Sequence, residues 1–165
     1  MSKTDFLWNE LIYGGHWGSI SASAIVLTTM VVLQIAIRWD FLLLAYLVTQ
    51  CTYNYNRIKE IDIDSKTNSA RVNHLKKYKG FLCFIPGLYG CIFFLLLIIF
   101  GDKNSILFGG IILILGLLFT IKAKNLSRII PGFKSVYTGF AWGLMVIFTS
   151  IYCSYNINIS VILFS

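Results

Sequence analysis

The stretch FLCFIPGLYGCIFFLLLIIF, residues 81–100, holds no charged side chain and decides the fold class. As a helix it is long enough to cross a hydrocarbon core of about 30 Å, which takes roughly 20 residues. Across the chain, 57% of the residues are hydrophobic, 13% are charged, and the mean hydropathy is +0.75. A water-soluble domain could not bury that much apolar surface in its core. We therefore expect an all-α integral membrane protein.

Further apolar runs, each bounded by charged or polar residues, lie on both sides of this stretch. They predict a transmembrane helical bundle of about five to six helices, which forms a single domain over residues 1–165. A last apolar segment, residues 157–165, is too short to span a bilayer. The other runs cover residues 20–37, 41–53, 106–121 and 136–152.

The first 13 residues mix charged and apolar side chains. Lys3, Asp5 and Glu10 are interspersed with large apolar residues, in a pattern typical of a helix that lies in the membrane interface. A signal peptide would instead begin with a basic segment followed by a short apolar core. We expect an interfacial helix here.

Basic residues gather in two of the segments between the runs, residues 54–80 and 122–135, whereas the opposite loops carry only Arg38 and Lys103. The positive-inside rule therefore predicts that loops 54–80 and 122–135 are cytoplasmic, with the N-terminus beside them and the chain in the cytoplasmic membrane. Topology and contact with anionic membrane lipids account for the net charge of +7. We expect no nucleic-acid partner.

Three of the seven acidic residues fall in the segment NRIKEIDID, residues 56–64. If the preceding helix continues through it, Asn56, Glu60 and Asp64 share one face, about 6 Å apart along the axis. Such oxygen ligands suit Mg²⁺, with Mn²⁺ as a possible replacement, and a diphosphate would bridge the ion. The adjoining spans could then hold an apolar tail. The alternative is a set of solvated ion pairs one helical turn apart, with no ligand.

The same segment resembles the first aspartate-rich motif of the UbiA superfamily of intramembrane prenyltransferases, in which Asn or Asp, Asp or Glu, and Asp recur at every fourth position. Asn56, Glu60 and Asp64 match that motif. Three further segments are similar to the family: SKTNSAR (residues 65–71), FTIKAKNLSRIIPGFKSVYTGFAW (residues 119–142) and, more weakly, IYGGHW (residues 12–17).

This resemblance implies the N-terminal part of the UbiA fold and transfer of a prenyl group from a polyprenyl diphosphate to an unknown lipid or aromatic acceptor. It also implies that Asn56, Glu60 and Asp64 hold Mg²⁺, and that Asn56, Arg71 and Lys134 contact the prenyl diphosphate. It assigns no catalytic residue. His16 and His74 are expected to be polar interfacial residues.

The family has further spans and a second aspartate-rich motif, whereas no acidic residue follows Asp102 in this chain. We therefore expect an incomplete enzyme, for which a partner chain would supply the second motif. The alternative is a non-catalytic membrane protein or subunit that retains the lipid diphosphate and magnesium site. A small transporter or channel ranks last, because the apolar runs contain no Asp, Glu, Lys or Arg.

Overall fold

The computed structural model describes residues 3–78, 80–123 and 130–153, with the side chains of residues 3, 62–64, 122, 123 and 134 left undescribed. Every regular element in these ranges is a helix, and they contain no strand. The expected all-α fold is thus confirmed for the described part of the chain. The elements are α1 (Lys3–Tyr13), α2 (His16–Val32), α3 (Trp39–Thr67), α4 (Ser69–Leu75), the 3₁₀ turn η1 (Lys76–Tyr78), α5 (Phe84–Phe100), α6 (Lys103–Leu118), the π-helical turn η2 (Phe119–Ala123) and α8 (Phe133–Tyr152).

Local sequence explains where several helices begin. The Asp102 carboxylate accepts a hydrogen bond from the backbone N–H of Ser105 at 2.8 Å and caps α6. Pro86 lies in the first turn of α5, where the missing N–H leaves no hydrogen bond unmade. Gly132 precedes α8 with a φ of 82°, a left-handed conformation that glycine adopts without strain.

Helix α3 runs without a break from its apolar first half into its charged second half. Its 29 residues correspond to about 43 Å of helix, longer than a hydrocarbon core of about 30 Å. The helix therefore does continue through residues 56–64, which is the condition for the shared face of Asn56, Glu60 and Asp64. Treating residues 54–80 as a loop was wrong, because most of that segment belongs to α3, α4 and η1.

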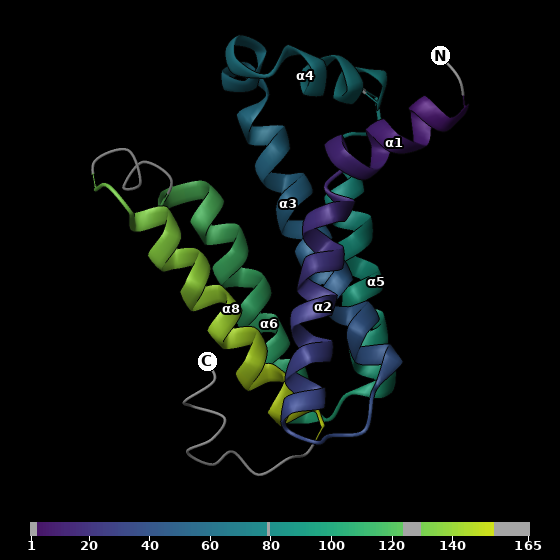
Figure 1. Ribbon diagram of the computed structural model, residues 1–165, viewed down its shortest axis with the longest axis vertical. Coiled ribbons are helices and arrows are strands. Elements are labelled where there is room, and N and C mark those ends of the chain that lie inside the picture. The colour runs from purple at the N-terminus through teal and green to yellow at the C-terminus, as the bar shows by residue number, and fades with distance from the viewer. Residues whose placement is uncertain (1–2, 79, 124–129, 154–165) are drawn as a thin grey trace.

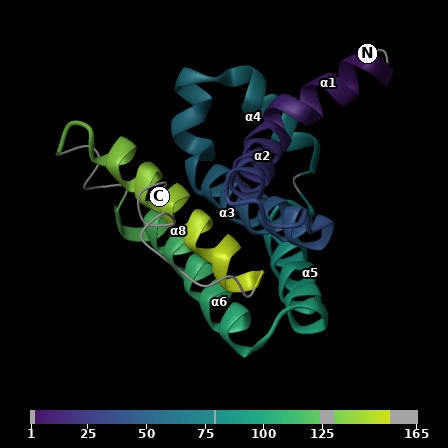
Figure 2. The same cartoon turned by 60° about the horizontal axis from the view of Figure 1, so that its bottom comes forward.

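Helix α3 lies at the centre of the molecule and contacts α2, α4, α5, α6 and α8. Figure 1 shows α2 and α5 beside α3, and α6 and α8 as a pair that diverges from α3 toward the end where α4 lies. The rotated view in Figure 2 shows the same α6–α8 pair on one side of α3 and α5 on another. α1, α4 and the start of α8 thus occupy one end of the molecule, and the turn from α2 to α3 occupies the other.

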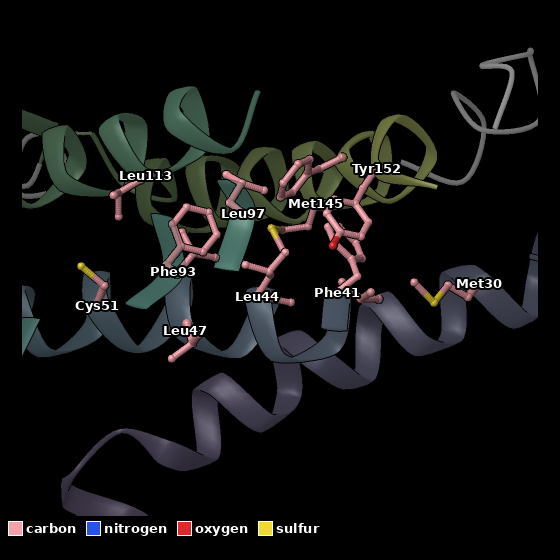
Figure 3. Packing of buried hydrophobic residues seen from close by; sticks show 14 residues of the cluster. Met30, Phe41, Leu44, Leu47, Cys51, Phe93, Leu97, Leu113, Met145 and Tyr152 are labelled. Carbon is pink, nitrogen blue, oxygen red and sulfur yellow. The ribbon is translucent and has the colours of Figure 1, made fainter. Parts of the chain in front are cut away.

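The apolar core forms where these helices cross α3. Phe41 and Leu44 of α3, Phe93 and Leu97 of α5, and Phe148 of α8 are all fully buried (Figure 3). The Phe41 and Phe148 rings meet edge to face with centroids 4.9 Å apart. The buried side chains of α2, α3, α5, α6 and α8 interdigitate in one contiguous cluster.

A polar network closes the core at the end opposite α4. The Asp40 carboxylate accepts hydrogen bonds from the Arg38 guanidinium at 2.6 and 3.0 Å and from the Tyr152 hydroxyl at 2.6 Å. The Arg38 guanidinium also lies over the Tyr152 ring, 5.1 Å from its centroid. This network joins the last turn of α8 to the first turn of α3.

Two helical segments of the described chain are long and apolar enough to cross a membrane, Lys103–Ile121 and Ser135–Tyr152. A third results if α1 and α2, bent by 63° at the glycines between them, count as one broken span. α5 is a shorter apolar helix of 17 residues. These findings agree with a membrane protein, while the number of five to six spans stays a prediction.

Gly109 and Gly87 form a matched pair for testing the core. A Cβ on Gly109 would lie 2.7 Å from Leu97 Cδ2 and 3.1 Å from Phe148 Cζ, whereas a Cβ on Gly87 would meet no atom within 4 Å. Gly109→Ala should therefore lower the free energy of unfolding by about 1–2 kcal/mol through overpacking. Gly87→Ala should be neutral or raise it by up to about 1 kcal/mol. Thermal unfolding in detergent would show the order, and a Gly109→Ala midpoint at or above that of Gly87→Ala would contradict this packing.

Candidate functional site

The charged half of α3 brings together two of the residues that the sequence singles out. The Asn56 amide Nδ2 donates a hydrogen bond to the Glu60 carboxylate at 3.1 Å, and both side chains are half-buried. They share one face of α3, as the spacing predicts. Asp64 lies one turn further along the same helix, and its side chain is outside the described residues.

A pocket of about 250 Å³ lies between α3, η2 and the pair α6 and α8. Asn56 is the last α3 residue along its wall, after Thr49, Thr52 and Tyr53. The opposite walls are mainly apolar and include Ile112, Leu115, Phe119, Phe140, Ala141, Leu144 and Met145. The pocket is therefore apolar for most of its lining and polar along α3, up to the residue that contacts Glu60.

The shape of this pocket depends on contacts between α6 and α3 and between α8 and the end of α6. Gly116 lets α6 approach α3, because a Cβ at this position would lie 2.5 Å from the Thr52 methyl carbon. The Tyr137 hydroxyl donates to the Leu115 carbonyl oxygen at 2.6 Å, and its ring stacks on Phe119 with centroids 4.1 Å apart. Phe119 begins the π-helical turn η2, a rare geometry that often occurs at functional sites. The Tyr137 contacts therefore join α6 and α8 into one wall, and this wall meets α3 where Gly116 packs against Thr52.

The predicted phosphate contacts lie on α4 and α8, whose described residues do not contact each other, although α4 and the start of α8 lie in the same half of the molecule (Figure 1). Arg71 lies in the first turn of α4, where its backbone N–H donates to the Asn68 side chain at 3.2 Å. Asn68 is thus the N-cap of α4, which gives this position a structural role. Lys134 lies in the first turn of α8, and its side chain is undescribed.

Among the described side chains, no group of three or more His, Cys, Asp and Glu residues is arranged to hold a metal ion. The predicted set of Asn56, Glu60 and Asp64 contains two such residues, one of them undescribed. Magnesium binding by this set therefore stays a prediction.

A second polar cluster, which the sequence analysis did not find, surrounds Glu10. The Glu10 carboxylate accepts hydrogen bonds from His74 Nε2 at 2.9 Å and from the Tyr78 hydroxyl at 2.7 Å, and His16 Nε2 lies 3.4 Å away. The other ring nitrogen of His16 contacts the Tyr46 hydroxyl. The cluster connects α1, α2, α3, α4 and η1. Only 4% of the surface of His74 is exposed, so its polar partners are side chains of the protein, and its position at the membrane interface stays a prediction.

The hydrogen bonds in this cluster stabilise the ionised form of Glu10. The hydrogen bond from His16, followed by those from Tyr78 and His74, lowers the pKa of Glu10 from 4.5 to about 2, although burial opposes the shift. Burial and the hydrogen bond to Glu10 raise the pKa of Tyr78 to about 12. Glu10 therefore stays ionised, and Tyr78 stays a hydrogen-bond donor, over the physiological pH range.

The bend between α1 and α2 is fixed from α3. The Gln50 amide donates to the Gly14 carbonyl oxygen at 2.8 Å and accepts a hydrogen bond from Ser19 at 2.6 Å. The Arg57 guanidinium donates to the Tyr13 carbonyl oxygen at the C-terminus of α1, where a cation also complements the helix dipole. α3 thus positions α1 with one residue of its apolar half and one of its charged half.

No family model matches the chain, and no curated protein or solved structure is significantly similar to it.

The Glu10 cluster makes stability dependent on pH. Because the pKa of Glu10 is lower in the folded protein, its contribution is fully present above pH 4.5 and is lost as the pH falls toward about 2. Glu10→Gln should cost about 2 kcal/mol at pH 7, since charged hydrogen bonds are lost, and should reduce the loss of stability between pH 5 and 3. Thermal unfolding in detergent at both pH values would measure this. Equal acid sensitivity in the two proteins would contradict the assignment to Glu10.

Proposed function

We propose that this protein binds a prenyl diphosphate in the membrane. The prenyl chain would lie in the pocket between α3, α6 and α8, and the diphosphate at its Asn56 edge. The observation that supports this proposal is the change in pocket lining, from apolar walls to Asn56, whose amide donates a hydrogen bond to Glu60 just beyond the pocket. A ligand with a long apolar chain and a charged headgroup matches that change.

The headgroup end has the chemistry for a magnesium diphosphate. Amide and carboxylate oxygens suit Mg²⁺, which needs one or two carboxylates and completes its shell with water and phosphate oxygens. We assign Glu60 and Asp64 as metal ligands, with Asn56 orienting the ion or a phosphate oxygen. Arg71 and Lys134 lie on elements at the same end of the molecule and are the proposed phosphate partners.

The reaction that we propose is prenyl transfer of the UbiA type. The carbon–oxygen bond between the prenyl group and the diphosphate breaks, a bond to the acceptor forms, and the acceptor loses a proton. A magnesium ion would stabilise the negative charge of the leaving diphosphate. The apolar walls on α6 and α8 would exclude water from the reacting carbon, and fixed charges act most strongly in such surroundings. The sequence resemblance to the UbiA superfamily supports the reaction type, and the acceptor is an unidentified lipid or aromatic compound.

The second candidate function is binding of the same ligand without transfer. It is favoured by the distribution of acids, since the sequence holds one acidic cluster on α3 and no acidic residue after Asp102. A product assay on protein that binds the ligand separates the two functions. If the acidic cluster of α3 does not suffice for transfer, a partner chain is the proposed source of a second cluster.

Binding should depend on the carboxylates of α3. We expect magnesium-dependent binding of a radiolabelled prenyl diphosphate to the detergent-purified chain, and at least about tenfold weaker binding by the Glu60→Gln, Asp64→Asn double variant. Asp102→Asn is the matched control, because it also replaces a carboxylate by an amide but keeps the cap of α6 at the opposite end. Equal binding by all three proteins, or binding by none, would overturn the site.

Substitutions on α8 test whether the prenyl chain occupies the pocket. Ala141 lines the pocket, whereas Gly139 on the same helix has no atom within 4 Å of an added Cβ. Ala141→Leu should fill part of the pocket and weaken binding of both a prenyl diphosphate and the uncharged prenyl alcohol by about tenfold, or ~1.4 kcal/mol. Gly139→Leu should leave both affinities unchanged. The opposite order of the two variants in a radioligand assay would place the prenyl chain elsewhere.

A further inference from the structure

We infer that α1 binds the boundary between headgroups and acyl chains of an anionic bilayer through its face of Leu7, Trp8, Leu11 and Ile12. The inference is independent of the proposed function, since none of these residues lines the α3–α6–α8 pocket. It specifies which face of α1 meets the lipid and what holds that face in place.

One side of α1 is already occupied by protein. Phe6, Glu10 and Tyr13, spaced three and four residues apart, all face α4. The His74 ring centroid lies 6.3 Å from that of Phe6 and 5.8 Å from that of Tyr13, and Glu10 accepts the hydrogen bond from its Nε2 atom. Because His74 is buried, these contacts fix the rotation of α1 about its own axis.

The other side of α1 is exposed and mainly apolar, with Thr4 and Asp5 as its polar residues. Leu7 is 66% exposed, Trp8 is 62% exposed and Ile12 is 43% exposed, and Leu11 lies between them on the same face. A helix with large aliphatic residues and a Trp on one face is typical of segments that lie in the plane of a membrane surface. Trp prefers this depth because its ring is apolar and its N–H group needs a polar partner.

The surroundings of this face identify lipid as the occupant. Trp17 at the start of α2, Phe81 just before α5 and Phe84 at its start are also strongly exposed. The starts of α2 and α5 lie at the same end of the molecule as α1 (Figure 1). Lys76 and Lys77 of η1 are exposed beside α4, and their charge complements anionic headgroups. The exposed apolar surfaces of α2 and α5 continue from this aromatic level along the length of those helices.

A membrane-spanning α1 is the competing arrangement, because α1 and α2 together could form one broken span. The bend of 63° turns α1 away from the axis of α2. α1 also carries Asp5 and the ionised Glu10, and carboxylates are costly in the acyl core. Both observations favour an α1 that lies along the surface.

Trp8 fluorescence tests this inference. A variant with Trp17, Trp39 and Trp142 changed to Phe leaves Trp8 as the single reporter, in bilayers of zwitterionic lipid with or without anionic phosphatidylglycerol. We expect stronger quenching by lipids brominated near the headgroup than by lipids brominated near the chain end, weak quenching by aqueous iodide, and the strongest shallow quenching with the anionic lipid. Glu10→Gln should shift Trp8 away from this depth, because it weakens the hydrogen bonds from His74 and Tyr78 that help to orient α1.

Other outcomes overturn the inference. Strong iodide quenching would show a face open to water, dominant quenching by deep bromines would show a spanning α1, and resistance to all quenchers would show a face covered by protein. If the single-tryptophan chain does not fold, the difference in quenching between the unaltered chain and Trp8→Phe reports the same depth.

Discussion

Burial of one face of α3 is the interaction on which the rest of the structure depends. Phe41 and Leu44 lie in the larger of the two apolar clusters that the described residues build, and α2, α5, α6 and α8 all pack around α3 there. The core occupies the first half of α3, so the second half is free to carry charge. Without the packing of the first half, neither the pocket nor the Asn56–Glu60 pair would have a fixed position.

Carboxylates close the helical assembly at both ends. At one end Asp40 joins α3 to α8, and at the other Glu10 joins α1 to α4 and η1. Each accepts hydrogen bonds from a tyrosine and from a nitrogen-containing side chain, which satisfies charges that would otherwise be costly near a membrane. Apolar packing alone allows helices to slide or rotate, whereas these contacts specify their register.

Local patterns predicted the helices but not the contacts between distant segments. The apolar runs and the four-residue spacing of Asn56 and Glu60 are local patterns. They were enough to predict the all-α fold and the shared helix face of these two residues. Glu10 and His74 are 64 residues apart, and no spacing rule connects them. The pocket was anticipated only as room between spans, because its shape depends on how α6 crosses α3 at Gly116. The number of membrane spans was harder to predict, because α3 is apolar over only half of its length.

The unbroken backbone of α3 has a mechanical consequence. Thr49 and Thr52 on the pocket wall and Glu60 at its polar edge belong to one hydrogen-bonded rod, with no proline, glycine or π-turn between them. Because the helix is continuous, a rotation of its charged end about the helix axis would turn Thr49 and Thr52 by the same angle. The position of Glu60 and the shape of the pocket wall are therefore coupled through one continuous helix, and a hinge inserted between residues 53 and 56 would uncouple them.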